Sequence, residues 1–136
     1  MKGYVLIVDD NHVDLKLQSE LLQIAGFETS IAADAAAAHV LLQSRVPDLI
    51  LTDIAMPGMD GLAFTRTIKA NARLRHIPVV ALTAFAMKGD EHAAMEAGCD
   101  AYITKPIDTR RFPEQIGGVL WAAQPMRSCE ARREPR

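Results

Sequence analysis

Five short apolar runs, separated by longer segments with helical periodicity, are the feature of this sequence that most restricts its fold. The runs are Tyr4–Val8, Phe27–Ala32, Leu49–Thr52, Val79–Leu82 and Ala101–Thr104. Several are apolar without alternation, as expected for parallel strands that are covered on both faces. Strands that alternate with helices predict an α/β fold, in which right-handed crossovers place helices on both sides of one parallel sheet.

The segments between these runs carry helix patterns with recognisable ends. The first predicted helix has one apolar stripe, formed by Val13, Leu17, Leu21 and Ile24 at intervals of four, four and three, and Gly26 can end it. Three more helices follow from their end signals: one capped by Asp34 and running through Ser44, one after Asp60 with Leu62 and Ile68, and one from about Met87 that Gly98 closes.

The fifth predicted helix is the least regular. Asp108 can cap it, but Pro113 then stands five residues in, where its ring collides with the carbonyl group four residues back. We therefore expect a distorted first turn and a regular helix from about residue 112 or 113 to Trp121. Gly117 and Gly118 each weaken this helix by about 1 kcal/mol relative to alanine.

Length and composition limit the class of protein. The chain has 136 residues, 49% apolar and 24% charged, which suits one globular domain. No apolar stretch approaches the roughly 20 residues of a membrane span, and the N-terminus lacks the apolar region of a secretory signal. Cys99 and Cys129 show no metal-type spacing. We expect a cytoplasmic protein with no membrane partner.

The charge of the chain is unevenly distributed. Residues 125–136 hold four arginines and two glutamates, and the rest of the chain holds 11 basic and 15 acidic residues, a net charge of −4. This balance argues against a nucleic-acid partner, which would require a clustered basic face. We expect one domain over residues 1–123 and a disordered basic tail over residues 124–136.

Polar or charged residues stand at the ends of four of the predicted strands. Asp9 and Asp10 follow the first strand, Asp53 the third, Thr83 the fourth and Lys105 the fifth. Each one alone would be read as a strand-end polar group or a helix cap. Because the carboxyl ends of parallel strands share one edge, the full set predicts a common site there.

The chemistry of this set favours phosphoryl transfer. Clustered carboxylates without a histidine or cysteine partner suit a hard cation, and Mg²⁺ more than Ca²⁺. A carboxylate can attack phosphorus, while a lysine and a hydroxyl neutralise and hold the phosphoryl oxygens. Asp53 is the best nucleophile candidate because it stands alone on the third strand. The Asp9-Asp10 pair is placed to hold metal.

These residues, at these spacings, closely resemble the CheY-like receiver domain of two-component response regulators: Asp9-Asp10, Asp53, Thr83 and Lys105-Pro106. The resemblance covers about residues 1–123. It implies a flavodoxin-like, doubly wound, three-layer (βα)5 fold with a five-stranded parallel sheet in the order 2-1-3-4-5. It also implies that Asp53 accepts phosphate from a histidine kinase or a phosphotransfer protein, as a phosphorelay switch and not as an enzyme acting on other substrates.

The resemblance further assigns the metal ligands. It implies that Asp10 and Asp53 bind Mg²⁺ directly, together with the backbone carbonyl group of Ala55. Asp9 then orients the metal through water.

The same resemblance assigns the switch. Thr83 and Tyr102 match the switch pair, in which the hydroxyl group turns toward the phosphoryl group and the ring moves inward. Lys105 would contact the phosphoryl group, and the peptide bond before Pro106 would be cis. A downstream protein would bind through the fourth helix, the fifth strand and the fifth helix.

Within the family, the stretch from His76 to Ile107 looks most like DivK-type cell-division regulators and like receivers attached to hybrid histidine kinases. The start at Met1 favours a stand-alone regulator over a receiver excised from a hybrid kinase. Two other readings are a binding module that is never phosphorylated and an aspartyl-phosphate phosphatase. Such phosphatases need a second acid two positions after the nucleophile, where this chain has Asn11 after Asp9, so the phosphatase is disfavoured.

Overall fold

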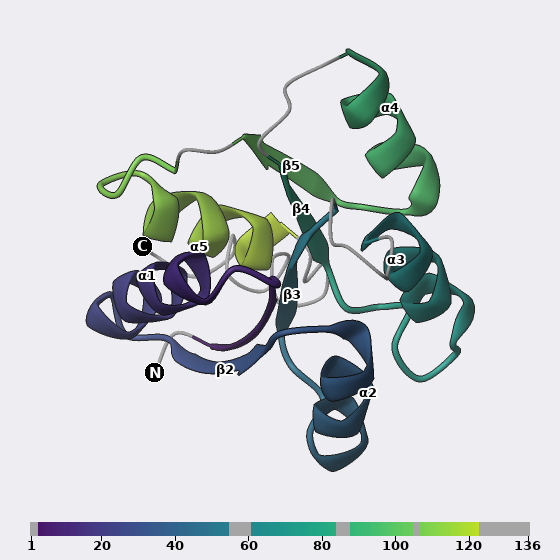
Figure 1. Ribbon diagram of the computed structural model, residues 1–136, viewed down its shortest axis with the longest axis horizontal. Coiled ribbons are helices and arrows are strands. Elements are labelled where there is room, and N and C mark those ends of the chain that lie inside the picture. The colour runs from purple at the N-terminus through teal and green to yellow at the C-terminus, as the bar shows by residue number, and fades with distance from the viewer. Residues whose placement is uncertain (1–2, 55–60, 84–87, 105–106, 123–136) are drawn as a thin grey trace, which may run out of the picture.

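The computed structural model describes residues 3–54, 61–83, 88–104 and 107–122. Strands and helices alternate in this part of the chain (Figure 1): β1 Tyr4–Val8, α1 His12–Ile24, β2 Glu28–Ala32, α2 Ala35–Ser44, β3 Leu49–Asp53, α3 Gly61–Ala70, β4 Val79–Thr83, α4 Lys88–Ala97, β5 Ala101–Thr104 and α5 Phe112–Ala122. The five predicted strands are confirmed, with bounds that differ by at most one residue. Asp60, Met87 and the predicted tail lie outside the described residues.

All neighbouring strands are parallel, and their order is β2-β1-β3-β4-β5, as the family resemblance implied. Figure 1 shows α1 and α5 on one side of the sheet and α2, α3 and α4 on the other. The three layers form the predicted flavodoxin-like fold. None of the described helices is long and apolar enough to cross a membrane.

Alternation along the strands divides the core into two clusters. In β1, Leu6 and Val8 pack with the helices α2, α3 and α4, while Val5 and Ile7 pack with α1 and α5. Successive side chains of a strand point to opposite faces, so a strand that is apolar throughout can fill both clusters. Every residue of β1, β3 and β4 is buried, which confirms the prediction of strands covered on both faces.

The first helix is confirmed, but most of its predicted apolar stripe faces solvent, and of the four residues only Leu21 packs against the core. Leu15, Gln18 and Leu22 are the buried residues of α1. The side chains of Val13 and Ile24 are 75% and 85% exposed. At 3.6 residues per turn, these two lie on the side of the helix opposite Leu15 and Leu22. An apolar stripe ordinarily marks the buried side of a helix. Here a second apolar face is left toward solvent.

The helix ends follow the predicted caps. Asp34 Oδ1 accepts a hydrogen bond of 2.8 Å from the backbone N–H of Ala37 at the start of α2. Gly26 and Gly98 follow α1 and α4 with φ of 104° and 109°, in the left-handed region that glycine enters without steric cost.

The irregular start of the fifth helix is also confirmed. Asp108 accepts side-chain hydrogen bonds from the backbone N–H groups of Arg110 and Arg111, within a turn that precedes α5. The regular helix begins at Phe112. Pro113 therefore lies in the first turn of the helix, where a missing N–H costs nothing and its ring meets no helical carbonyl group.

Candidate functional site

The register of the sheet brings the predicted residues to one edge. Val8 pairs with Thr52, so Asp9 and Asp53 are the next residues at the same level of β1 and β3. Asp53 pairs with Leu82, which places Thr83 one residue further along β4. The prediction that these strand ends share one edge is therefore borne out for every candidate that the structure describes. Ala55, Lys105 and Pro106 lie outside the described residues.

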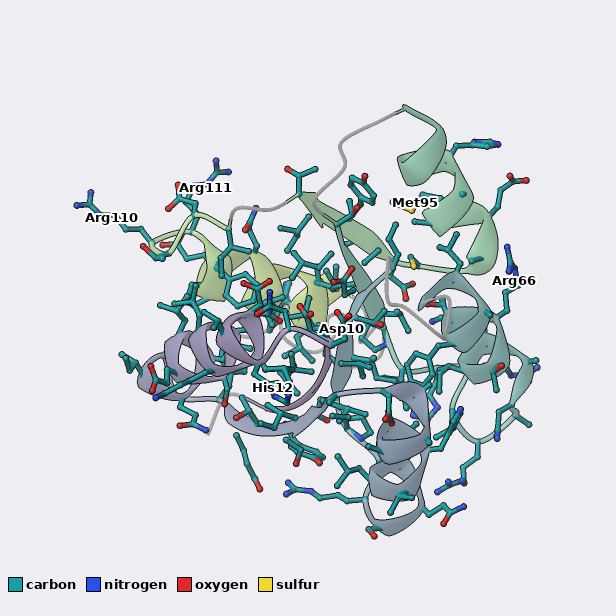
Figure 2. All side chains as sticks on the ribbon, viewed as in Figure 1. Asp10, His12, Arg66, Met95, Arg110 and Arg111 are labelled. Carbon is teal, nitrogen blue, oxygen red and sulfur yellow. The ribbon has the colours of Figure 1, made fainter. Side chains whose placement is uncertain are left out.

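Three carboxylates gather at this edge. Asp9, Asp10 and Asp53 each offer an oxygen atom, and these three atoms all lie within 4.8 Å of one another. Asp9 is fully buried and Asp53 is 7% exposed, whereas Asp10 is open to solvent. Figure 2 shows Asp10 near the centre of the view, in the connection from β1 to α1. The cluster thus has a buried floor of two acids and an accessible third acid.

Hydrogen bonds fix the turn that carries Asp9 and Asp10. The backbone N–H of Asp9 donates to the carbonyl oxygen of Ala32 at 3.1 Å, and Asp9 Oδ1 accepts from the backbone N–H of Asn11 at 2.9 Å. Asn11 is the N-cap of α1, since its Oδ1 accepts from the N–H of Asp14 at 3.1 Å. The strand end and the start of the helix are therefore joined through Asp9.

Gln18 is a member of the site that the sequence did not reveal. It projects from the buried side of α1, and its Nε2 donates to Asp9 Oδ2 at 3.2 Å. A lone glutamine inside a helix pattern is normally a surface residue. Gln18 could have been identified only by knowing which side of α1 is buried, and the apolar stripe in the sequence suggested the wrong side.

Gly61 has a steric role at the end of β3. The first residue of α3 lies so close to the end of β3 that a Cβ atom there would be 2.2 Å from the carbonyl oxygen of Asp53 and 2.5 Å from Cα of Ile54. Contacts this short do not occur with real side chains. The missing side chain of Gly61 therefore allows α3 to pack directly against the backbone that carries Asp53.

The donor set suits a divalent cation. Two like unit charges 4 to 5 Å apart repel by about 3 to 4 kcal/mol at an effective dielectric constant of about 20, so three acids at one edge favour a positive ion between them. Their oxygen atoms are hard ligands, and an arrangement with few protein ligands and one face open to water matches the preference of Mg²⁺. The cluster is therefore compatible with Mg²⁺ bound beside Asp53.

Thr83 and Tyr102 lie on the same face of the sheet. Tyr102 pairs with Ala81, and both pack in the cluster beneath α2, α3 and α4. Thr83 is two residues beyond Ala81, so its side chain points to that same face. Thr83 is 1% exposed and Tyr102 is half-buried. A threonine at the acidic edge thus shares a face of the sheet with an aromatic ring on the neighbouring strand, two residues back in the register.

Cys99 is outside this site. Its Sγ lies 3.8 Å from the hydroxyl oxygen of Thr65, and burial raises the pKa of the thiol. A buried thiol with a raised pKa is a poor nucleophile.

Comparison with known proteins gives a consistent family match. The model of the response regulator receiver domain family matches residues 5–117. The polar-differentiation response regulator DivK of Brucella ovis is 47% identical over 120 residues, which cover 88% of this chain and 98% of that protein.

Solved structures with the same fold include receivers of two kinds. The chemotaxis protein CheY4 of Vibrio cholerae aligns with a TM-score of 0.82 and 26% identity, over 86% of this chain and 98% of that chain. The signal receiver domain of a signal transduction histidine kinase from Syntrophus aciditrophicus aligns with a TM-score of 0.81 and 32% identity, over 90% of this chain and 92% of that chain.

The close packing of Gly61 against the end of β3 can be tested by adding a side chain at this position. We expect Gly61→Ala to lower the free energy of unfolding by about 1 to 3 kcal/mol, because the new Cβ forces the backbone of β3 and α3 apart. Gly118→Ala is the matched control. Apart from the backbone of α5 itself and the adjoining residues, no atom of the described residues lies within 4 Å of the Cβ position there, so this change should stabilise α5 by up to about 1 kcal/mol. Urea unfolding measures both. Equal stability of Gly61→Ala and wild type would contradict the steric role.

Proposed function

The chain belongs to the response regulator receiver domain family, and we propose that it is a phosphoacceptor switch of a two-component system or phosphorelay. In this proposal Asp53 takes a phosphoryl group from a phosphohistidine of a histidine kinase or phosphotransfer protein, and the phosphorylated chain changes its protein contacts. The observation that carries the proposal is the convergence of Asp9, Asp10 and Asp53 at one edge of the sheet. Because the kinase draws on cytoplasmic ATP, the switch would act in the cytoplasm.

Asp53 has the best position for the nucleophile. It ends the central strand β3, and the other two acids lie on its β1 side. Gly61 lies close against the backbone of Asp53. One of its carboxylate oxygens would attack phosphorus as the phosphorus–nitrogen bond of the donor breaks, and the imidazole would leave with the electron pair and take up a proton. The product is an aspartyl phosphate on this chain.

The remaining residues of the site would prepare Asp53 for this step. Asp10 and Asp53, with the backbone carbonyl group of Ala55, would hold Mg²⁺, and Asp9 would orient it through water. When bound, Mg²⁺ neutralises charge on the phosphoryl oxygens. Lys105 would neutralise a further phosphoryl oxygen.

The structure supplies an argument against the phosphatase alternative. That chemistry needs a second acid two positions after the first-strand nucleophile, and Asn11 occupies that position. Its side chain caps α1 by accepting the N–H of Asp14, so it offers no acid to a leaving group. In this proposal the chain would catalyse only its own phosphorylation and dephosphorylation.

The assignment of Asp53 can be tested by intact mass after incubation with acetyl phosphate and Mg²⁺. Wild type should gain one phosphoryl group, while Asp53→Asn should gain none, because the attacking oxygen is lost. Asp53→Asn should be at least as stable as wild type, since one negative charge leaves the cluster.

Asp48→Asn is the matched control, because Asp48 accepts the N–H of Tyr4 at the opposite edge of the sheet. It should label as wild type does. Labelling of Asp53→Asn at the wild-type level would move the acceptor to Asp9 or Asp10. A wild-type protein that never labels would favour a binding module without phosphorylation.

The exposed apolar face of α1 is the surface we propose for the phosphodonor. A donor must bring its phosphohistidine to the acidic edge, and α1 begins at that edge, directly after Asp10 and Asn11. Val13 and Leu17 stand one turn apart on its first turns and are 75% and 38% exposed. An apolar helical face on the donor could bury both side chains while its histidine reaches Asp53.

We expect the double variant Val13→Ser, Leu17→Ser to accept phosphate at least about tenfold more slowly from its protein donor, because two buried apolar contacts are lost. Labelling by acetyl phosphate should stay at the wild-type rate. The donor would be whichever purified kinase of the host labels wild type fastest. Val40→Ser changes a similarly exposed valine on α2 and is the control. Unchanged phosphotransfer in the double variant would exclude this surface.

Thr83 and Tyr102 would link the phosphoryl group to the partner surface. New acceptor oxygens on Asp53 would draw the Thr83 hydroxyl group toward the edge. The space that opens lies on the face of the sheet where Tyr102 packs, so the ring can move inward and change the surface of α4, β5 and α5. A downstream protein would recognise that surface.

The coupling predicts a specific loss in Thr83→Ala. This variant should still accept phosphate on Asp53, yet amide hydrogen exchange around Tyr102 should differ little between its phosphorylated and free forms, because no hydroxyl group responds to the phosphate. Thr67→Ala is the control, since the Thr67 hydroxyl group is exposed and donates to the carbonyl oxygen of Ala63 within α3. A full wild-type exchange response in Thr83→Ala would exclude Thr83 as the coupling residue.

A further inference from the structure

Gln18 is a polar residue in an apolar layer. It lies on the buried side of α1 between Leu15 and Leu22, and only 2% of it is exposed. The core beneath this side of α1 is formed by apolar side chains such as Ile7 and Phe112. A leucine or methionine would fit the pattern of this layer, so the amide group of Gln18 needs a reason of its own.

The amide group of Gln18 is only half satisfied. Its Nε2 donates to Asp9 Oδ2 at 3.2 Å. Its Oε1 is buried and accepts no hydrogen bond from the residues that the structure describes. Burying an acceptor without a donor costs free energy, and this cost offsets the stability that the hydrogen bond of Nε2 contributes. A contribution to the stability of the core therefore does not explain why a glutamine stands at this position. The contact that distinguishes it from an apolar residue is the hydrogen bond to Asp9.

That bond reaches the acidic cluster from the side of α1. Continuing the alternation of β1 beyond Val8, Asp9 points to the face on which Ile7 meets α1 and α5. One oxygen of Asp9 accepts the backbone N–H of Asn11 and the other accepts Gln18. Two donors on two different oxygens hold the carboxylate group in one orientation.

We propose that Gln18 is a positioning residue of the cation site: it holds the buried carboxylate group of Asp9 in the orientation from which Asp9 reaches Mg²⁺ through water. The inference rests on the proposed function, because the cation is part of it. Groups that orient a metal site from behind typically change its metal affinity by 10- to 100-fold when they are replaced. The buried Oε1, which accepts no hydrogen bond from the described residues, lowers the stability of the fold in return for this orientation of Asp9.

The test compares Mg²⁺ affinity with fold stability. Gln18→Met removes the donor and the unpartnered acceptor at nearly constant volume, and Gln18→Leu is a second variant of different shape. We expect both to raise the Mg²⁺ dissociation constant, measured by calorimetry, by about tenfold. The urea midpoint should stay the same or rise, because the buried acceptor is gone. Gln23→Met is the control. Gln23 is on the same helix and bonds to Ser19 and Thr29, so its loss should leave Mg²⁺ affinity unchanged.

The Asp9→Asn background tests whether Gln18 acts through Asp9. There the charged group that Gln18 holds is absent, so Gln18→Met should change the Mg²⁺ dissociation constant less than twofold. A Gln18→Met protein with wild-type affinity, or one with the same tenfold loss in both backgrounds, would overturn the proposal. A wild-type chain that does not bind millimolar Mg²⁺ would instead overturn the cation part of the proposed function.

Discussion

Repulsion among carboxylates at the carboxyl edge of the sheet is the constraint on which the site depends. The register of β1 and β3 sets Asp9 beside Asp53, and the turn after β1 adds Asp10 within 4.8 Å. Bringing like charges together costs free energy. The fold supplies that free energy from elsewhere, because β1, β3 and β4 are buried over their whole lengths. A cation or a partner that relieves the repulsion therefore acts on a site that the core already holds in place.

The two edges of the sheet handle charge in different ways. At the amino edge, acids are matched with bases: Lys69 bonds to Asp100 at 2.9 Å, and Arg45 pairs with Glu28, which lowers the pKa of the Glu28 carboxyl group. Such pairs tie α3 and α2 to the strands. At the carboxyl edge, three acids instead gather around one point, and Asp9 accepts hydrogen bonds from two neutral donors. The ion pairs at the first edge thus serve the fold, whereas the acids at the second edge can respond to an added ion or phosphoryl group.

The strands could be predicted from the apolar runs, and the gathering of Asp9, Asp10 and Asp53 from the residues at the strand ends, whereas the strand order came from the family resemblance. The orientation of α1 could not be predicted, because that helix carries two apolar faces and only the sheet decides which is buried. The more regular stripe, with Val13 and Ile24, is the exposed one. The roles of Gln18 and Gly61 could not be predicted for a related reason. Their roles depend on distances to Asp9 and Asp53 across the fold, and no local pattern encodes such distances.

Residues of the site point to different faces of the sheet. Asp9 points toward the α1 side, where Gln18 reaches it, whereas Thr83 points toward the side of α3 and α4, where Tyr102 packs. An event at the edge can therefore be received on one face and passed to the other. Ala81 lies directly opposite Tyr102 in the register, so the side chain that faces the ring across this strand pair is a single methyl group. A small side chain at this position gives the ring room for the proposed movement, which would change the surface at α4 and β5.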